Sequence, residues 1–335
     1  MVKNKQIFFT DVRKTEFLEN EVADPTGNQV RTKMEYTVVS GGTERACLLG
    51  MQNTVRTFPL SLGYCGVGYV DAIGPDVKNV AVGDRVLVYH GHHSKYNLNP
   101  ESDITKVEDD KIDSLEAAFV VIASMGLGGV RKLEFEIGES AMVMGQGLLG
   151  IFSTQFLRLS GANPLIVADL NPERRELALK LGADYAFDPS DKDFVQKVKD
   201  VTRGKGVKAC VEVTGIAQAM NQALDCMAWQ GRISLLGCTR ISDSSVDYYQ
   251  QVHCPGIKLI GAHNFVRPKV ESYPHHWTHH DDCRAILDMI STKRIQVLPI
   301  ISRIESPDNA VAVYNELAED NKNFPIGTVF DWRAM

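Results

Sequence analysis

The strongest constraint on the fold is a run of residues at positions 141–150, Ala-Met-Val-Met-Gly-Gln-Gly-Leu-Leu-Gly. Its apolar residues predict a buried strand, and its glycines follow at the spacing GxGxxG. Gly145 would permit a tight turn, Gly147 a close approach of the backbone to a pyrophosphate, and Gly150 close packing of the next helix on the strand. Free N–H groups and the helix dipole favour phosphate there. We therefore expect a dinucleotide on the loop formed by Gly145, Gln146, Gly147, Leu148, Leu149 and Gly150.

A second buried strand, predicted at 165–168, ends in Asp169, 24 positions after Gly145. An acid at this place can hydrogen-bond both ribose hydroxyls, and its charge would repel a 2′-phosphate. The sequence therefore predicts NAD(H), with NADP(H) disfavoured. Arg174 lies on the following helix, near the adenosine end, where it could cover the adenine.

Strand and helix signals alternate along the middle of the chain. Buried strands are predicted at 141–144, 165–168, 185–187, 209–213, 232–236 and 258–261. Helix-like stretches lie between the first four, for example at 172–181 and 193–201. Short buried strands with helical crossovers predict the α/β fold class, with a Rossmann doubly wound parallel sheet.

The two ends of the chain have a different pattern. Short apolar runs at 35–39, 68–73 and 85–89 are divided by Gly, Pro and Asp, which predicts a small, irregular β-barrel or sandwich over residues 1–123. An apolar helix is expected at 115–133. After residue 264 the alternation stops, and we expect a helix at 281–291 and strands at 295–303 and 325–331.

Composition and charge exclude several classes of protein. The 335 residues carry a formal net charge of −6, without the basic block that favours nucleic acid. No apolar run is long enough to cross a membrane, and the first residues lack a signal-peptide pattern. The seven cysteines are scattered and include no CxxC pair, which is typical of reduced thiols. We expect a cytoplasmic protein with a small-molecule substrate and no nucleic-acid or membrane partner.

Several motifs, which together cover nearly the whole chain, resemble those of the medium-chain dehydrogenase/reductase superfamily. They are Gly42-Thr43-Glu44, Gly-Tyr-Cys-Gly-Val-Gly at 63–68, Gly83-Asp84-Arg85-Val86, the glycine loop with Asp169, and Leu181-Gly182-Ala183-Asp184. Val213-Thr214-Gly215 and Leu236-Gly237 resemble strand ends that face the nicotinamide in that family. The resemblance implies that Thr214 and Gly237 contact the cofactor.

The resemblance also implies the domain organisation and the reaction. A GroES-like β-barrel catalytic domain would comprise residues 1–123 and 264–335, and a Rossmann NAD-binding domain residues 124–263. The reaction would be hydride transfer between a nicotinamide and an alcohol, carbonyl or activated alkene, which needs close, aligned approach of the reacting carbons. A homodimer or homotetramer is implied as well, with the strand at 258–261 as a shared edge.

Many members of this family carry a catalytic zinc on cysteine, histidine and carboxylate ligands. In this sequence the ligand positions fall at Gly41, Tyr64 and near Val121, none of which binds zinc well. The clustered cysteines of the family's structural-zinc loop are also absent. We therefore expect that zinc takes no part in catalysis.

The pattern Ser-Gly-Gly-Thr-Glu-Arg at 40–45, with Phe-Pro-Leu at 58–60, resembles a zinc-less branch of the family. That branch includes dehydrogenases of sugars, cyclitols and the hydroxyethyl group of bacteriochlorophyll precursors. The alternative is a rearranged metal site, for which the available side chains are Cys47, Cys65, His90, His92 and His93.

Without a metal, a side chain must move the proton of a substrate hydroxyl. Thr43 lies where the family has a serine or threonine proton relay, and Tyr64 could hydrogen-bond the substrate oxygen. The loop after residue 89 carries His92 and His93, either of which could act as a general base near neutral pH. The candidate catalytic residues are therefore Thr43, Tyr64, His92 and His93, with a solvated loop as the alternative for each histidine.

A second histidine cluster occupies residues 273–282, Tyr-Pro-His-His-Trp-Thr-His-His-Asp-Asp. One interpretation is a substrate-binding loop or incidental metal site, in which Trp277 stacks on a sugar-like face. The other is an exposed loop followed by the N-terminal cap of a helix that starts near Asp281. The sequence leaves both open.

Four functions are compatible with these observations. The first is NAD(H)-dependent interconversion of a secondary alcohol and a ketone on a polyol- or sugar-like substrate, without catalytic zinc. The second is a quinone or enoyl reductase of the same superfamily, which usually prefers NADPH, so that Asp169 argues against it. The third is a zinc-dependent alcohol dehydrogenase with a rearranged metal site. The fourth is a redox-sensing or structural protein that only binds NAD.

Overall fold

The computed structural model describes Met1–Met335, and the chain divides into two compact units. Unit 1 comprises Met1–Ile122 and Cys283–Met335, and unit 2 comprises Ala123–Asp282. The second boundary differs from the expected residue 264, because residues 264–282 group with unit 2. Arg267 and Trp277 attach this segment to helix α3 (Val120–Arg131) of the structure. None of the helices has the length and apolar character needed to cross a membrane.

Unit 2 is built on a six-stranded, all-parallel sheet with the strand order β10-β9-β8-β11-β12-β13. The strands are β8 (Ala141–Met144), β9 (Leu165–Ala168), β10 (Tyr185–Phe187), β11 (Val207–Glu212), β12 (Met227–Leu235) and β13 (Lys258–Gly261). The order reverses between β8 and β11, as in a doubly wound Rossmann sheet. The expected fold class is confirmed, and four of the six strands have the expected bounds.

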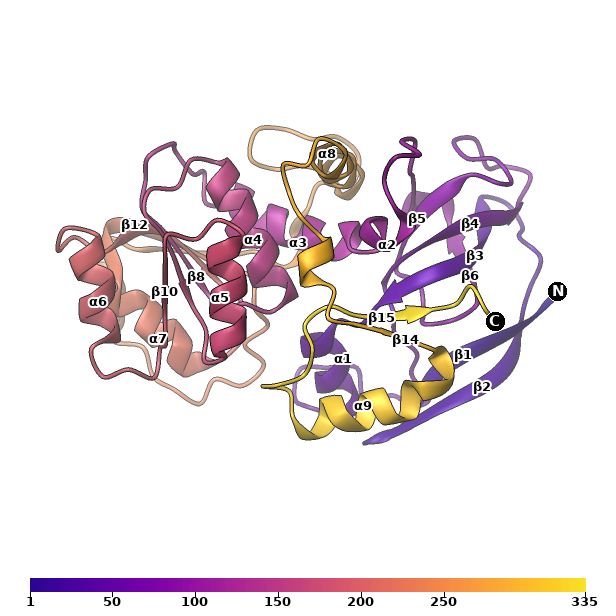
Figure 1. Cartoon of the computed structure of the whole chain (residues 1–335), viewed down its shortest axis with the longest axis horizontal. Coiled ribbons are helices and arrows are strands. Elements are labelled where there is room, and N and C mark those ends of the chain that lie inside the picture. The colour runs from indigo at the N-terminus through magenta and orange to yellow at the C-terminus, as the bar shows by residue number, and fades with distance from the viewer. The chain divides into compact units, whose positions relative to one another are not determined.

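Helices flank this sheet (Figure 1). They are α4 (Leu148–Leu159), α5 (Pro172–Lys180), α6 (Phe194–Val201) and α7 (Ala217–Asp225), with single turns at Tyr248–His253 and Asn264–Val266. The start of α5 follows local chemistry, because Pro172 fits the first turn and the Asn171 side chain accepts a hydrogen bond from the N–H of Glu173 at 2.9 Å. Phe194 and Val198 of α6 are fully buried in the core.

Unit 1 contains a mostly antiparallel seven-stranded sheet and a separate two-stranded ribbon. The ribbon is β1 (Val2–Asp11) with β2 (Lys14–Val22), and the sheet consists of β3 (Gln29–Val38), β4 (Cys65–Ile73), β5 (Arg85–Tyr89), β6 (Tyr96–Pro100), β7 (Ile104–Lys106), β14 (Arg303–Glu305) and β15 (Thr328–Asp331). Strand β15 pairs with β3, so the last residues of the chain complete a sheet begun near its start. The expected β-rich domain from both chain ends is thus present.

The helices of unit 1 are short. They are α1 (Gly41–Leu48), α2 (Ser114–Ala117), α9 (Ala310–Glu319) and single turns at Glu101–Asp103, Leu298–Ile300 and Pro307–Asn309. Helix α9 lies beside β2 and α1 (Figure 1), and its Tyr314 is fully buried in the core. Helices α3 and α8 (His279–Ser291) each cross the boundary between the units.

Two expectations about elements were wrong. The strand expected at 295–303 is replaced by a 3-10 turn at Leu298–Ile300, because Pro299 in its middle cannot donate a ladder hydrogen bond. The helix expected at 115–133 is split into α2 and α3. The helix expected at 281–291 is present as α8, which starts two residues earlier, because the Thr278 hydroxyl accepts a hydrogen bond from the Asp281 N–H at 3.2 Å and caps the first turn.

The junction of β8 and α4 depends on Gly150. A Cβ atom at this position would lie 1.9 Å from the carbonyl oxygen of Gly145, so no side chain fits between helix and strand. Gly147 differs, since nothing lies within 4 Å of the position its Cβ would take. Packing of the protein itself therefore requires glycine at Gly150 but not at Gly147.

We predict that Gly150→Ala lowers the free energy of unfolding of the protein without cofactor by about 1–3 kcal/mol, because the carbonyl of Gly145 must move out of the sheet register. The matched variant Gly147→Ala should change it by less than about 1 kcal/mol. Urea denaturation followed by circular dichroism measures both. Equal stability of the two variants would contradict this account of the junction.

Candidate functional site

The glycine loop of unit 2 presents a free backbone surface. Gly145 has a φ of 94°, a conformation that favours glycine, and it turns the chain between β8 and α4. Helix α4 begins at Leu148 without any side-chain cap, so its first N–H groups are available to an external acceptor. The open space beside Gly147 lies at this helix end. The loop therefore has the free N–H groups and the clearance that a phosphate requires.

Only the backbone of Gln146 belongs to this surface. Its side chain is fully buried, where the amide donates to the carbonyl of Gly145 at 3.1 Å and accepts from the Thr154 hydroxyl at 3.0 Å. Leu148 is buried and Leu149 half-buried. The predicted contributions of these residues to cofactor binding can therefore come only through main-chain groups.

Asp169, at the end of β9, is tied to the glycine loop. One carboxylate oxygen accepts from the Gln146 N–H at 2.6 Å and the other from the Asn171 N–H at 2.8 Å. Each oxygen keeps a further lone pair, which is what two ribose hydroxyls would need. Burial lowers the pKa of Arg174 on α5, and the negative charge of Asp169 partly offsets this effect. The structure thus brings the loop, Asp169 and Arg174 together.

The carboxyl end of β11 carries an acid that the sequence analysis did not identify. Glu212 is fully buried, and its Oε1 accepts hydrogen bonds from both the N–H and the hydroxyl of Thr214. Its Oε2 has no hydrogen-bond partner, and burial raises the pKa of this carboxyl. The Gly237 N–H donates to the Glu212 carbonyl at 2.7 Å. Glu212 therefore fixes both Thr214 and Gly237, the predicted nicotinamide contacts.

In unit 1, Tyr64 forms a chain of hydroxyl groups with the start of α1. Its phenolic oxygen lies 2.5 Å from the Ser40 hydroxyl and also hydrogen-bonds the Thr43 side chain. Burial raises the pKa of Tyr64 well above its ordinary value, so the phenol keeps its proton. Ser40 is the residue before α1, and Thr43 lies in its first turn. The structure thus joins two predicted catalytic residues, Thr43 and Tyr64.

His93 is not at the protein surface. Its side chain is 1% exposed and forms part of a buried network with Glu44, whose side chain is 0% exposed. The His93 Nε2 lies 3.2 Å from one oxygen of Glu44, and the Tyr314 hydroxyl donates to the other at 2.7 Å. The backbone N–H of Ser40 also donates to Glu44, at 3.0 Å. Glu44 thus gathers groups from three distant parts of the chain.

Both ring nitrogens of His93 have hydrogen-bond partners inside the protein. The Nδ1 atom lies 2.7 Å from the Thr37 hydroxyl, and Nε2 faces the carboxyl group of Glu44. The Thr37 hydroxyl oxygen also accepts a hydrogen bond from the Trp332 indole at 2.9 Å, because an indole N–H can only donate. The ring of His93 is therefore held on both sides by buried polar groups.

His92 differs from its neighbour, since its side chain is exposed. Its ring hydrogen-bonds the carbonyl of Ser61, and burial of part of the ring lowers its pKa below the ordinary value. The loop is held against the segment that ends in Tyr64, because a Cβ at Gly63 would meet the His93 nitrogen at 2.2 Å. Of the two predicted histidines, His92 is therefore the one available to solvent and ligands.

The donor set does not fit a catalytic zinc. The ligand positions of the family are Gly41, Tyr64 and Val121, and a phenol with a raised pKa is a poor ligand. Burial also raises the pKa of the Cys65 thiol, which disfavours the thiolate that zinc requires. No group of three or more His, Cys, Asp or Glu side chains is arranged to hold a metal ion anywhere in the structure.

The histidine cluster at 273–282 folds against α3 in unit 2. Trp277 covers the guanidinium of Arg131, with 3.7 Å between the guanidinium carbon and the ring centroid. One face of the indole is therefore occupied by protein, and stacking of the other face on a sugar-like ligand stays a prediction. Thr278 caps α8, as the alternative interpretation of this segment expects.

Five residues of the site were not identified from the sequence, namely Ser40, Thr37, Glu44, Tyr314 and Glu212. The sequence could have indicated Glu44, because it follows Thr43 within one of the motifs that resemble the family. It could not have indicated Tyr314, which lies 270 residues from the carboxylate it contacts.

Comparisons with known proteins agree with this fold. Residues 27–132 match the family model described as the alcohol dehydrogenase GroES-like domain, and residues 149–271 match the zinc-binding dehydrogenase model. The chain is 31% identical to L-threonine 3-dehydrogenase of Pyrococcus horikoshii, over 53% of this chain and 59% of that protein. It is 26% identical to sorbitol dehydrogenase of Bacillus subtilis, over 59% and 67% respectively.

A solved structure has the same fold. A putative zinc-binding dehydrogenase from Sinorhizobium meliloti, bound to NADP, superposes with a TM-score of 0.84 at 21% identity, and the match covers 99% of this chain and 100% of the other. The chain is thus a two-domain protein of the GroES and Rossmann type. It belongs to the medium-chain dehydrogenase/reductase superfamily, as expected. The names of its relatives agree with the expected class of alcohol-dehydrogenase-like oxidoreductase.

We predict that Glu212→Gln makes stability less dependent on pH. The folded state raises the pKa of Glu212, so the wild-type protein loses stability as pH rises through that pKa. The free energy of unfolding of the wild type, relative to the variant, should therefore fall as pH rises above about 4.5, the ordinary pKa of the unfolded carboxyl, and through the raised pKa of the folded one. Denaturant titrations at several pH values measure it, with the exposed Glu176→Gln as the control. A difference that does not change with pH would contradict the assignment.

Proposed function

We propose that the protein is a dehydrogenase that interconverts a secondary alcohol and a ketone with NAD(H), on a polyol- or sugar-like substrate and without catalytic zinc. The observation that carries the proposal is the hydroxyl chain of Ser40, Tyr64 and Thr43, in which Tyr64 stands at a position where the resemblance implies a metal ligand. It supplies proton chemistry at a place where the donor set does not suit zinc.

The residues of unit 2 fit a nicotinamide dinucleotide. The N–H groups of the glycine loop and the start of α4 would bind the pyrophosphate, and Asp169 would bind the adenosine ribose. Arg174 would lie over the adenine, while Thr214 and Gly237 would face the nicotinamide. When bound, the cofactor supplies the hydride acceptor or donor. Asp169 favours NAD(H), because its negative charge repels the 2′-phosphate of NADP(H).

Tyr64 would hold the substrate oxygen and exchange a proton with it. A phenol with a strongly raised pKa is a poor base alone, so its proton must be passed on as the substrate proton arrives. Ser40, whose hydroxyl lies 2.5 Å from the phenol, and Thr43 provide this path. His92 is the exposed acceptor nearby in the fold, and its lowered pKa keeps it neutral and able to accept a proton near neutral pH.

His93 takes a different part in this proposal from the one predicted for it. Its two ring nitrogens are bonded to Thr37 and Glu44, and its side chain is closed to solvent. We therefore place His93 as a positioning residue. Through Glu44 it fixes Ser40 and the first turn of α1, and thereby the partners of Tyr64.

The substrate class is supported by the polar surroundings of Tyr64 and by relatives named sorbitol dehydrogenase and (R,R)-butanediol dehydrogenase. Assembly into a homodimer or homotetramer through the edge strand β13 stays a prediction. In the chain itself β13 pairs only with β12 and leaves one edge of the sheet unpaired.

We predict that Tyr64→Phe lowers kcat for alcohol oxidation by about 100-fold or more, because the substrate oxygen loses its proton partner. Steady-state NAD reduction across a panel of polyols and sugars measures it. The control is Tyr69→Phe, which removes the hydroxyl of an exposed tyrosine on the neighbouring strand β4. Its kcat should equal that of the wild type.

Metal analysis of the same purified protein tests whether catalysis requires zinc. Elemental analysis should show no stoichiometric zinc, and prolonged dialysis against a chelator should leave kcat unchanged. One zinc per chain whose removal abolishes activity would overturn the zinc-independent mechanism. Full activity of Tyr64→Phe would overturn the role of the phenol.

We predict that Asp169→Asn shifts cofactor preference toward NADPH by about tenfold or more, since it removes the charge that repels the 2′-phosphate and keeps an oxygen for the loop. Equilibrium binding of NADH and NADPH by fluorescence titration measures the ratio. Glu176→Gln, which removes an exposed acid from α5, should leave it unchanged. Tighter binding of NADPH than NADH to the wild type would favour the quinone or enoyl reductase alternative.

A further inference from the structure

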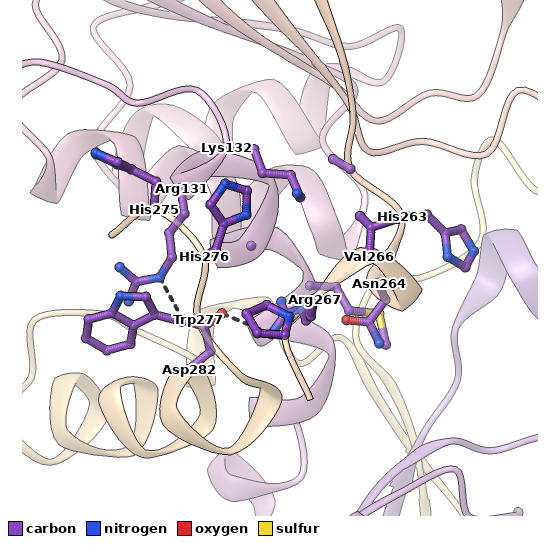
Figure 2. A pocket seen from close by; sticks show the side chains of 14 residues that line it. Arg131, Lys132, His263, Asn264, Val266, Arg267, His275, His276, Trp277 and Asp282 are labelled. Carbon is purple, nitrogen blue, oxygen red and sulfur yellow. Dashed lines mark hydrogen bonds and ion pairs between the residues drawn. The ribbon is translucent and has the colours of Figure 1, made fainter. Parts of the chain in front are cut away.

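A pocket lined by basic side chains lies between α3 and the segment 262–282 of unit 2, apart from the glycine loop (Figure 2). Its cationic and histidine side chains are Arg131, Lys132, Arg267, His263, His275 and His276. Figure 2 shows His263 and His275 pointing away to either side of the labelled Lys132 and His276. The function proposed above makes no use of this pocket.

Two residues of α3, Gly128 and Ser124, determine the position of the Arg267 side chain in the pocket. A Cβ atom at Gly128 would lie 2.4 Å from a guanidinium nitrogen of Arg267, so the glycine lets the guanidinium rest on the helix backbone. The same group donates to the carbonyl of Ser124 and, at 2.9 Å, to Asp282. The Arg267 side chain is only 9% exposed. It is therefore a fixed charge and not a mobile surface residue.

The positive charge of the pocket exceeds its negative charge. Asp282 is the only acid of the lining, and its oxygens are both used, by Arg131 at 2.7 Å and by Arg267. The neighbouring Asp281 accepts hydrogen bonds from Ser272 and Thr278 and does not line the pocket. Three permanent cations thus face one carboxylate.

Lys132 is the cation that lacks a counter-charge. Burial and the like charge of Arg267 both lower the pKa of its ammonium, and no carboxylate offsets them. Two cations held together beside free space repel each other unless an anion lies between them. The His276 ring, stacked on Tyr273 at a centroid distance of 4.8 Å, adds a further donor to the lining of the pocket.

We propose that Lys132, Arg267 and His276 bind the oxyanion head, phosphate or carboxylate, of a small molecule. The interior of the pocket is narrow, with room for about one water-sized group, so an oxygen of the head group could enter it whereas a whole nucleotide could not. Charged N–H donors bind such groups strongly, and Arg267 presents its donors in a fixed orientation. This is a second anion site, beyond the pyrophosphate site of the glycine loop.

Isothermal titration calorimetry with inorganic phosphate, and separately with acetate, tests the proposal on the full-length protein. Saturating NAD keeps the glycine loop occupied, and sodium chloride holds the ionic strength constant. We expect at least one of the anions to bind at a single site, about tenfold more weakly in Lys132→Gln and in His276→Gln. Lys180→Gln, which removes an exposed lysine from α5, should bind like the wild type.

The outcomes separate the two sources of the oxyanion. Binding of phosphate but not acetate identifies a phosphorylated ligand, and the converse identifies a carboxylated one. Gly128→Ala, which displaces Arg267 and leaves every charge in place, should weaken binding as well. Absence of binding by the wild type at millimolar anion, or equal binding by the wild type, Lys132→Gln and His276→Gln, would overturn the proposal. Because the readout is binding, neither result depends on the dehydrogenase reaction.

Discussion

The buried carboxylate of Glu44 is the interaction on which the catalytic half of the molecule depends. A carboxylate removed from water costs several kcal/mol unless its oxygens are fully hydrogen-bonded, and loss of one partner costs about 3–5 kcal/mol. Here the partners are the Ser40 N–H, the His93 ring and the Tyr314 hydroxyl. These come from the start of α1, the loop after β5 and the C-terminal helix α9. The need to satisfy one charge therefore holds the early and late segments of unit 1 together.

The same constraint orders the proposed catalytic groups. Ser40 uses its backbone N–H to bind Glu44 and its hydroxyl to bind Tyr64. Thr43 precedes Glu44 in the first turn of α1 and hydrogen-bonds the same phenol. The hydroxyl chain is thus anchored at one side by a buried charge network that leaves little freedom for its side chains. Preorganised donors of this kind are what a proton transfer without a metal requires.

Unit 2 handles negative charge in two different ways. The glycine loop offers neutral N–H groups at the start of α4, and Asp169, which accepts a hydrogen bond from the loop, is proposed to disfavour an additional phosphate there. The pocket at α3 instead uses the formal charges of Arg267 and Lys132, with Gly128 as the space that admits the guanidinium. The first arrangement is encoded within a short stretch of sequence. The second requires residues separated by more than a hundred positions to meet.

The sequence by itself determined the parallel sheet, its cofactor loop and the β-rich ends, because these follow from local patterns. Strands such as β8 and β9 are short, fully apolar and bounded by glycine or acid, and the distinct roles of Gly145, Gly147 and Gly150 depend on atoms a few residues away. Only the tertiary structure decided that His93 is an internal partner of Glu44, that Glu212 fixes Thr214, and that residues 264–282 fold onto α3. These outcomes depend on which side chain satisfies which buried charge, and a residue such as Tyr314 leaves no local trace of the carboxylate it will meet.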